Sequence, residues 1–143
     1  MLGFDIFIYI AIGLIVMFFL LGLQSQKGKA KGLVSGQLAP TGHKPNCAAS
    51  ENVESDKHHV APLSAEFWQA KDAVLATGGT ITAETESYLS ATYMSKIFKF
   101  VDDVELRDAG ERIIHIRSAS RVGYSDRGEN KKRVERIRAA LKS

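Results

Sequence analysis

An uncharged apolar run near the N-terminus constrains the fold of this chain more than any other feature. Residues 6–23 consist only of Ile, Phe, Leu, Val, Met, Ala, Gly and Tyr. At a rise of 1.5 Å per residue, a helix of this length reaches about 27 Å, close to the thickness of the hydrocarbon core of a bilayer. We therefore predict a transmembrane anchor over residues 1–24.

A cleaved signal peptide and a buried core helix are the alternatives to a retained anchor. A signal peptide begins with a positively charged region, has a shorter apolar core and ends at a small-residue cleavage site. Here Asp5 precedes the run without any Lys or Arg, and the Gly-Leu-Gln-Ser stretch at 22–25 is a weak cleavage site. The pattern therefore favours the retained anchor. Lys27, Lys29 and Lys31 follow it directly, and by the positive-inside rule they predict a cytoplasmic domain.

The segment after the anchor is rich in Gly, Lys, Ser and Pro, so we predict a flexible tether over residues 25–45. Cys47, the single cysteine of the chain, cannot form an internal disulfide. Its spacing to His58 and His59 matches no zinc pattern, so we expect no metal and no cofactor. We expect a small buried thiol at Cys47, with a reactive thiol activated by Lys44 as the alternative.

Residues 46–143 are predicted to form the folded domain, which opens with a helix and continues with strands. Ser64 is the expected N-cap of the helix, and Phe67 and Trp68 are expected in its buried stripe. Strands are expected at residues 80–85, 88–100, 101–106 and 112–118. Asp102 and Asp103 are expected at a bend or in solvent.

A second helix is predicted to close the domain. It begins at a capping box formed by Asp126 and Glu129, buries Val134 and Ile137, and leaves Arg133 in solvent. Short turns between the strands favour antiparallel pairing. The predicted fold class is α+β: an N-terminal transmembrane helix, then a two-layer domain in the order helix, antiparallel sheet of three to four strands, helix.

The polar stretch between the last strand and the last helix is the candidate site. Arg117 and Arg121 share strand parity, and a turn at Gly123 brings Arg121, Ser125 and the free amides at the helix start towards one anion. The candidate binding residues for an anion or a partner are Arg117, Ser118, Ser120, Arg121, Tyr124, Ser125, Asn130 and Arg133. The alternative is that these arginines pair inside the domain with Asp102, Asp103, Glu105 or Asp126.

Five short motifs together resemble one known family. They are Gly-Gln-Leu-Ala-Pro at 36–40, Pro-Asn-Cys at 45–47, Pro-Leu at 62–63, Asp-Asp-Val-Glu at 102–105 and Arg-Ser-Ala-Ser-Arg-Val-Gly-Tyr-Ser-Asp at 117–126. The chain resembles, over about residues 33–141, the bacterial and plastid family called domain of unknown function 1499. The resemblance implies a fold and a location near membranes, and it implies no reaction.

The chain departs from that family's pattern in two places. Family members often carry a second cysteine just before the Pro-Asn-Cys motif, whereas residues 40–43 here read Pro-Thr-Gly-His, so a disulfide at this point is excluded. Arg127 and Glu129 stand where the family usually has apolar residues. Many relatives look exported or lumenal, which implies a periplasmic domain. This conflicts with the lysines after the anchor, so the side of the membrane stays open.

These features predict a single-pass protein of the bacterial inner (plasma) membrane that acts as a non-catalytic binding or accessory module. Its expected partners are the lipid bilayer and other membrane-protein subunits. The mild net charge of +3 argues against nucleic acid. The alternative function is a small thiol-dependent or Ser/His-dependent enzyme that uses Cys47 or Ser125 with His58, His59 or His115. No nucleophile elbow, phosphate-binding loop or metal-ligand string supports catalysis, so no catalytic residue is assigned.

Overall fold

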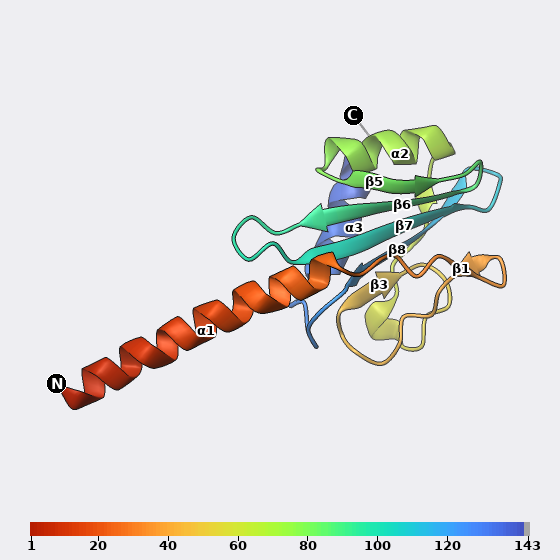
Figure 1. The fold of residues 1–143 in the computed structure, drawn as a ribbon. Coiled ribbons are helices and arrows are strands. Elements are labelled where there is room, and N and C mark those ends of the chain that lie inside the picture. Colours follow the sequence, from red (N-terminus) through yellow and green to blue (C-terminus); the bar gives the residue numbers. More distant parts are fainter. Residues whose placement is uncertain (142–143) are drawn as a thin grey trace.

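A long N-terminal helix extends away from a folded domain in the computed structural model, which describes residues 1–141 (Figure 1). This helix, α1, runs over Leu2–Gln26, two residues beyond the predicted anchor. Within its stretch Gly3–Gln26, an 18-residue window has a mean hydropathy of 2.9, and only 6% of that window is buried. By length and composition, α1 is therefore able to cross a membrane. The last two residues of the expected domain, 142–143, lie outside the described residues.

A six-stranded sheet forms the centre of the domain, with strand order β3-β8-β7-β6-β5 and with β4 also paired to β8. The strands are β3 (Cys47–Ala49), β4 (Leu63–Ser64), β5 (Thr80–Glu84), β6 (Tyr88–Met94), β7 (Val101–Asp108) and β8 (Ile113–Ser120). Each of these pairings is antiparallel. The predicted α+β class is confirmed. The sheet exceeds the expected four strands because β3 and β4, with three and two residues, are too short to show an alternating pattern.

Two helices, α2 (Phe67–Ala76) and α3 (Glu129–Ala140), cover one face of this sheet, which we call the helix face. A short 3-10 turn, η1 (Asp56–His58), lies between β3 and β4. The core under the helices joins Leu89, Ala91, Val104, Leu106, Ile114 and Ile116 of the strands to Ala70, Val74, Val134 and Ile137 of the helices. Alternate strand residues thus face the helices, as period-2 strands require.

The start of α2 differs from the prediction. Ser64 lies in β4, opposite Ile113, and does not cap the helix. Glu66 is the N-cap instead, in a capping box with Gln69. Trp68 is 62% exposed, so its prediction as a core residue was wrong, because the buried row of α2 is limited to Ala70, Ala73 and Val74, and Trp68 lies on the neighbouring row with the exposed Leu75.

The predicted strand 88–100 ends at Met94, and residues 95–100 form the tip of a hairpin between β6 and β7. The Phe100 amide donates to Ser95 Oγ at 2.9 Å and closes this turn. Ile97 is 70% exposed at the tip. Asp103, which was expected at a bend or in solvent, is buried inside β7. The strand was predicted too long because no Gly or Pro interrupts residues 95–100 to indicate a turn.

The start of α3 also departs from the expected capping box. Gly128 is the N-cap residue, with a left-handed φ of 79°. Asp126 accepts the amides of Gly128 and Asn130 at 2.8 and 2.9 Å, whereas Glu129 pairs with Arg136. Arg133, predicted to lie in solvent, is buried.

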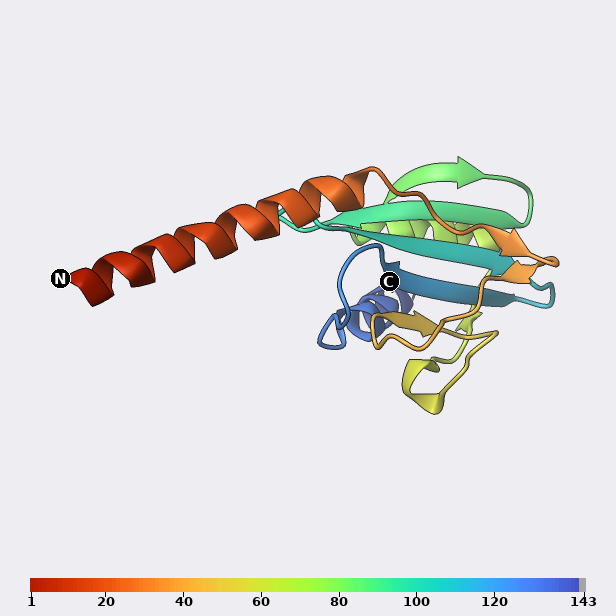
Figure 2. The same cartoon turned by 60° about the horizontal axis from the view of Figure 1, so that its bottom comes forward.

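The segment 27–41 crosses the other face of the sheet, which we call the second face (Figure 2). It contains a small hairpin of β1 (Leu33–Val34) and β2 (Gln37–Leu38), and it buries Leu38, Ala39 and Thr41. The Gly32 amide donates to Glu105 at 2.7 Å, and the Leu38 amide donates to Glu51 at 2.8 Å. This part of the expected flexible tether is therefore packed against the domain.

Candidate functional site

The polar junction between β8 and α3 divides over the two faces of the sheet. Ser118 lies opposite Val104 and Ser120 opposite Asp102. Both serine hydroxyls bond to Asn130 of α3 on the helix face. Arg117, opposite Glu105, and Arg121 lie on the second face, as their predicted shared parity requires. The eight candidate residues therefore do not form one site.

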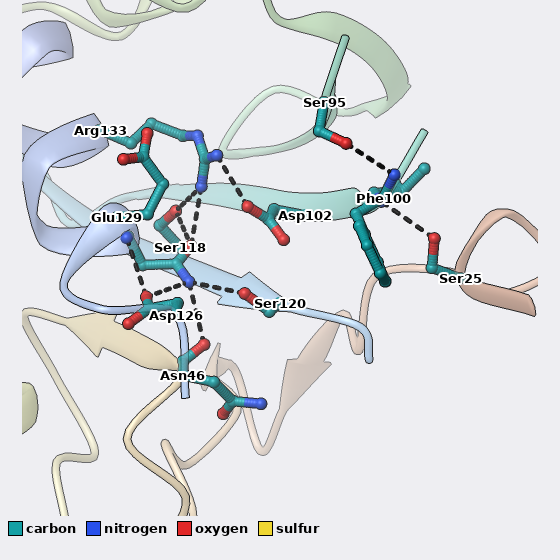
Figure 3. Close-up of polar contacts among 12 residues, drawn as sticks. Ser25, Asn46, Ser95, Phe100, Asp102, Ser118, Ser120, Asp126, Glu129 and Arg133 are labelled. Atoms are coloured by element: carbon teal, nitrogen blue, oxygen red, sulfur yellow. Dashed lines mark hydrogen bonds and ion pairs between the residues drawn. The ribbon is translucent and has the colours of Figure 1, made fainter. Parts of the chain in front are cut away.

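Asn130 is the centre of a hydrogen-bond network on the helix face. Its partners Ser118, Ser120 and Asp126 are labelled in Figure 3. The Asn130 side chain is fully buried. Its Oδ1 accepts from Ser118 Oγ at 2.6 Å, and its Nδ2 donates to Ser120 Oγ and to the Asn46 carbonyl, both at 3.0 Å. Nδ2 also donates to Asp126 Oδ2 at 2.6 Å. Asn130 thus joins β8, the loop before β3 and the start of α3.

Arg133 belongs to the same network. Its Nη1 donates to Asn130 Oδ1 at 2.8 Å and to Ser118 Oγ at 3.2 Å, and its Nη2 donates to Asp102 at 2.7 Å. The guanidinium also lies 4.9 Å from the centre of the Tyr93 ring, a cation–π distance. The predicted alternative of pairing inside the domain therefore applies to Arg133, and its role on this face is structural.

Tyr124 and Ser125 belong neither to the helix-face network around Asn130 nor to the pair of arginines, Arg117 and Arg121, on the second face. Tyr124 is 70% exposed, and Ser125 Oγ accepts the amide of Arg127 at 3.3 Å. Ser125 lines a small hollow of about 200 Å³ together with Cys47 and His58. His58 Nδ1 lies 2.9 Å from the Cys47 carbonyl oxygen, whereas the Cys47 thiol contacts the Ala48 carbonyl at 4.0 Å. His58 therefore contacts the backbone of Cys47, which is not the geometry of a thiol–imidazole pair.

One Ser–His–Glu arrangement was not predicted from the sequence. Ser50 Oγ lies 3.0 Å from His115 Nδ1, and His115 Nε2 lies 3.7 Å from Glu51. Ser50 Oγ is also held between the amide and the carbonyl of Ile116, at 2.9 and 3.4 Å. Glu51 is bound by Arg107 through two bonds of 2.6 and 2.8 Å. These contacts fix Ser50 and Glu51 to the strands, so the arrangement supports the sheet.

Glu51 has a pKa below its ordinary value. Burial alone would raise this pKa, but the hydrogen bonds from Arg107 and from the Leu38 amide outweigh it. This carboxylate is therefore held in its charged form. Among the described residues 1–141, no group of three His, Cys, Asp or Glu side chains is placed to hold a metal ion.

Arg121 forms a bidentate ion pair on the second face. Its Nε and Nη2 donate to the two oxygens of Asp103, both at 2.7 Å, and its Nη1 donates to the Ser25 carbonyl at 3.1 Å. The hydrogen bonds that Arg121 donates to Asp103 raise the pKa of Arg121. A bidentate pair of this kind is strong and geometrically fixed. It ties β7 and β8 to the end of α1.

Arg117 has much weaker contacts. Its Nη1 lies 3.3 Å from Glu105, its Nη2 lies 3.5 Å from the Pro40 carbonyl, and its Nε has no hydrogen-bond partner within the described chain. Arg117 is only 3% exposed. Glu105, fully buried, also accepts from the Tyr88 hydroxyl and the Gly32 amide, both at 2.7 Å. Since a guanidinium carries five N–H donors, Arg117 retains donor capacity that its neighbours do not use.

A cavity of about 570 Å³ opens beside these two arginines, between the sheet and the segment 27–44. Its cationic lining consists of Lys29, Lys31, Lys44, Arg117 and Arg121, with Asp103 as the carboxylate. The lysines are exposed, whereas both arginines are held by the sheet. The positive side chains therefore outnumber the negative one.

Cys47 lies in the wall of this cavity. Burial raises the pKa of its thiol, and the charges of Arg117 and Lys31 oppose that shift only in part. The group is therefore a neutral thiol at physiological pH. This supports the prediction of a small buried thiol over its reactive alternative.

Sequence reasoning missed the lysines of the cavity as site residues. Lys29 and Lys31 were used only to predict the side of the membrane, because the segment that carries them has no periodic pattern. The alternation of Lys at 27, 29 and 31 was the available signal: in an extended segment it places these side chains on one side.

The fold and the cavity define a small α+β domain behind an apolar helix, with a cationic cavity on the second face of its sheet. The chain belongs to the family described as protein of unknown function (DUF1499), whose family model matches residues 37–141. The resemblance inferred from the motifs is thereby confirmed. The match begins in β2 and covers the whole sheet with α2 and α3. Comparison with curated proteins gives no match.

Proposed function

We propose that this protein is a single-pass, membrane-anchored binding module, without catalytic activity, whose second-face cavity binds an anionic group. The observation that carries the proposal is Arg117, a buried guanidinium with unused donors in the wall of a cationic cavity. A buried donor without a partner costs about 1–3 kcal/mol. An anion that accepts from it offsets this cost.

The chemistry of the cavity favours a tetrahedral oxyanion such as a phosphate. Arginine and lysine side chains bind phosphate through charge-assisted hydrogen bonds. The same chemistry is present in free phosphate and in the headgroup of a phospholipid. The cavity is lined by Gly28, Lys29 and Lys31, which directly follow the end of α1 at Gln26. With α1 as the anchor, these residues lie at the level of the lipid headgroups.

The module is proposed to act at the bacterial inner (plasma) membrane, in contact with the bilayer and as an accessory to other membrane-protein subunits. Its support is the apolar α1, which is able to span a bilayer, and the absence of an assembled nucleophile–base pair at Cys47 and Ser125 within the described chain. The proposal is the same for either side of the membrane.

The test is a titration of the full-length protein in neutral detergent micelles, followed by two-dimensional NMR. Inorganic phosphate is one ligand, and a short-chain phosphatidic acid is the other. We expect saturable shifts of the Arg117 Nε–H and Gly28 amide signals. A much tighter response to the lipid identifies the headgroup as the source of the phosphate, and equal responses identify free phosphate.

The test has a matched pair of charge-reversal variants. Lys29→Glu with Lys31→Glu changes the cavity, whereas Lys131→Glu with Lys132→Glu makes the same change on the exposed side of α3. The first pair is expected to abolish the shifts and the second to leave them. Unchanged binding in the first pair, or no saturable shift in the unmodified protein, would rule the anion site out.

A further inference from the structure

The tip of the β6–β7 hairpin is apolar although it extends beyond the sheet. Met94 and Ile97 are 54% and 70% exposed, and Phe98 and Phe100 accompany them. Lys96 and Lys99 are the charged residues of the tip. Contiguous exposed apolar side chains are uncommon on soluble surfaces and mark contacts with a partner or a membrane.

The hairpin tip lies against the last turns of α1, and both project from the same end of the domain (Figure 1). The ring of Phe98 lies 5.2 Å from the ring of Phe18 and 5.1 Å from that of Phe19. Phe100 lies 6.4 Å from Phe18, edge to face. Gly22 permits this approach, because a Cβ at that position would overlap the backbone of Phe98.

Hydrogen bonds fix the two elements to each other. The Val101 amide donates to Ser25 Oγ at 3.0 Å, and the Gln26 amide group donates to the Lys99 carbonyl at 3.3 Å. The turn also satisfies its own backbone, since the Ser95 amide donates to the Phe100 carbonyl at 2.8 Å. The hairpin tip is therefore held at a defined level along α1.

That level lies inside the apolar run. Phe18 and Phe19 precede the end of the run at Leu23 by about 6–8 Å along the helix axis. An α1 that spans the bilayer therefore places the Phe98 ring at the outer part of the hydrocarbon region. The flanking Lys96 and Lys99 have stems long enough to reach the headgroups.

We propose that the β6–β7 hairpin tip inserts into the bilayer beside α1 and forms a second membrane contact of the domain. The inference rests on the proposed anchoring by α1 and is independent of the anion site. The lipid bilayer is the occupant because the tip continues the apolar surface of the helix that enters it. With two membrane contacts, α1 and the hairpin tip, the domain has a defined orientation on the membrane.

The test measures the depth of spin labels on the full-length protein in lipid nanodiscs. Labels are attached to Ile97→Cys at the tip, Val16→Cys in α1, and Leu75→Cys on the exposed side of α2, each in a Cys47→Ser background. Accessibility to oxygen, which concentrates in lipid, is compared with accessibility to a water-soluble nickel chelate. We expect the labels at positions 97 and 16 to be oxygen-accessible and shielded from nickel, and the label at 75 to show the reverse.

Each of the other outcomes overturns one part of the proposal, either the hairpin insertion alone or the anchor as well. A label at 97 that matches the one at 75, with the label at 16 in lipid, overturns the hairpin insertion and leaves the anchor. A label at 97 shielded from both reagents means that protein covers the tip, such as a second copy or another subunit, and also overturns it. Nickel access at 16 overturns the anchor and the inference together.

A second variant tests the contact with α1. Gly22→Leu forces the hairpin away from the helix, because the new side chain meets the Phe98 backbone. The label at position 97 is expected to gain nickel accessibility while the label at position 16 keeps its depth. An unchanged label at 97 in this variant would show that α1 does not hold the hairpin tip in the bilayer.

Discussion

The two faces of the sheet use the same kinds of residue in different ways. On the helix face, Arg133 makes bonds of 2.7, 2.8 and 3.2 Å around the buried amide of Asn130. On the second face, Arg117 reaches only 3.3 and 3.5 Å to its acceptors, whereas Nε lacks a hydrogen-bond partner within the described chain in both arginines. The density of polar residues at the junction therefore has two origins. One face is stabilised by a nearly complete network, and the other has longer arginine contacts beside a cationic cavity.

The largest effect is expected from Glu105→Ala on the second face. It leaves the buried Arg117 without its carboxylate and removes the acceptor of Tyr88 and Gly32. Breaking a buried pair in this way costs about 3–5 kcal/mol. The measurement is chemical unfolding of the full chain in detergent, followed by circular dichroism. Glu84→Ala, which breaks the more exposed pair with Lys71, is the control and should cost less than about 1 kcal/mol. Equal losses would contradict the structural role of Glu105.

A smaller loss is expected from Asn130→Ala on the helix face. The Ser118 hydroxyl and Arg133 then lose a common acceptor, and the start of α3 loses its link to β8. One or two unsatisfied buried groups cost about 1–3 kcal/mol. Anion binding to the second face should be unchanged in this variant when measured by the same phosphate titration. A selective loss of anion binding with intact stability would refute the assignment of separate roles to the two faces.

The smallest effect concerns the thiol of Cys47, which reports on the wall of the cavity. Because burial raises its pKa, alkylation by a neutral reagent at pH 7 should be slower in the folded chain than in urea. Each unit of raised pKa lowers the thiolate fraction about tenfold. The folded state also keeps the thiol proton to a higher pH than the unfolded state. The free energy of unfolding therefore falls as the pH rises above about 8.5, the pKa of an unfolded thiol.

The control for this measurement is Lys31→Gln. Loss of the Lys31 charge removes one of the interactions that lower the thiol pKa, so alkylation should slow further. Equal alkylation rates in folded and unfolded chains would show that the cavity wall does not shield Cys47.

The regular parts of this fold were predictable because their periodicity is local. The apolar run of α1, the alternation in β8 and the buried row of α3 each depend on residues close in sequence, and all three were found. The parity that separates Arg117 from Ser118 followed from the same alternation. The burial of Arg133 could not be predicted from the local pattern, because its partner Asp102 is 31 residues away in the sequence.

The contacts of the second face lay beyond local patterns for a similar reason. Segment 27–41 has few apolar residues, and its fixation depends on single amides and carbonyls that meet Glu105, Glu51 and Arg117. Backbone groups carry no sequence signature. The ion pairs themselves were among the stated alternatives, but their faces, and the cavity beside them, required the fold.

The covering of the second face by segment 27–41 also determines the order in which the protein can be completed. The Ser25 carbonyl accepts from Arg121, which follows it by 96 residues and lies just after β8. The Gly32 amide donates to Glu105 of β7, 73 residues later, and the Pro40 carbonyl accepts from Arg117 of β8, 77 residues later. At about 5–20 residues per second, synthesis of the most distant partner lags by roughly 5–20 s. Throughout that delay the segment has no surface to pack on. Closing such long loops is also slow in itself. The first part of the domain to leave the ribosome is thus among the last to fold.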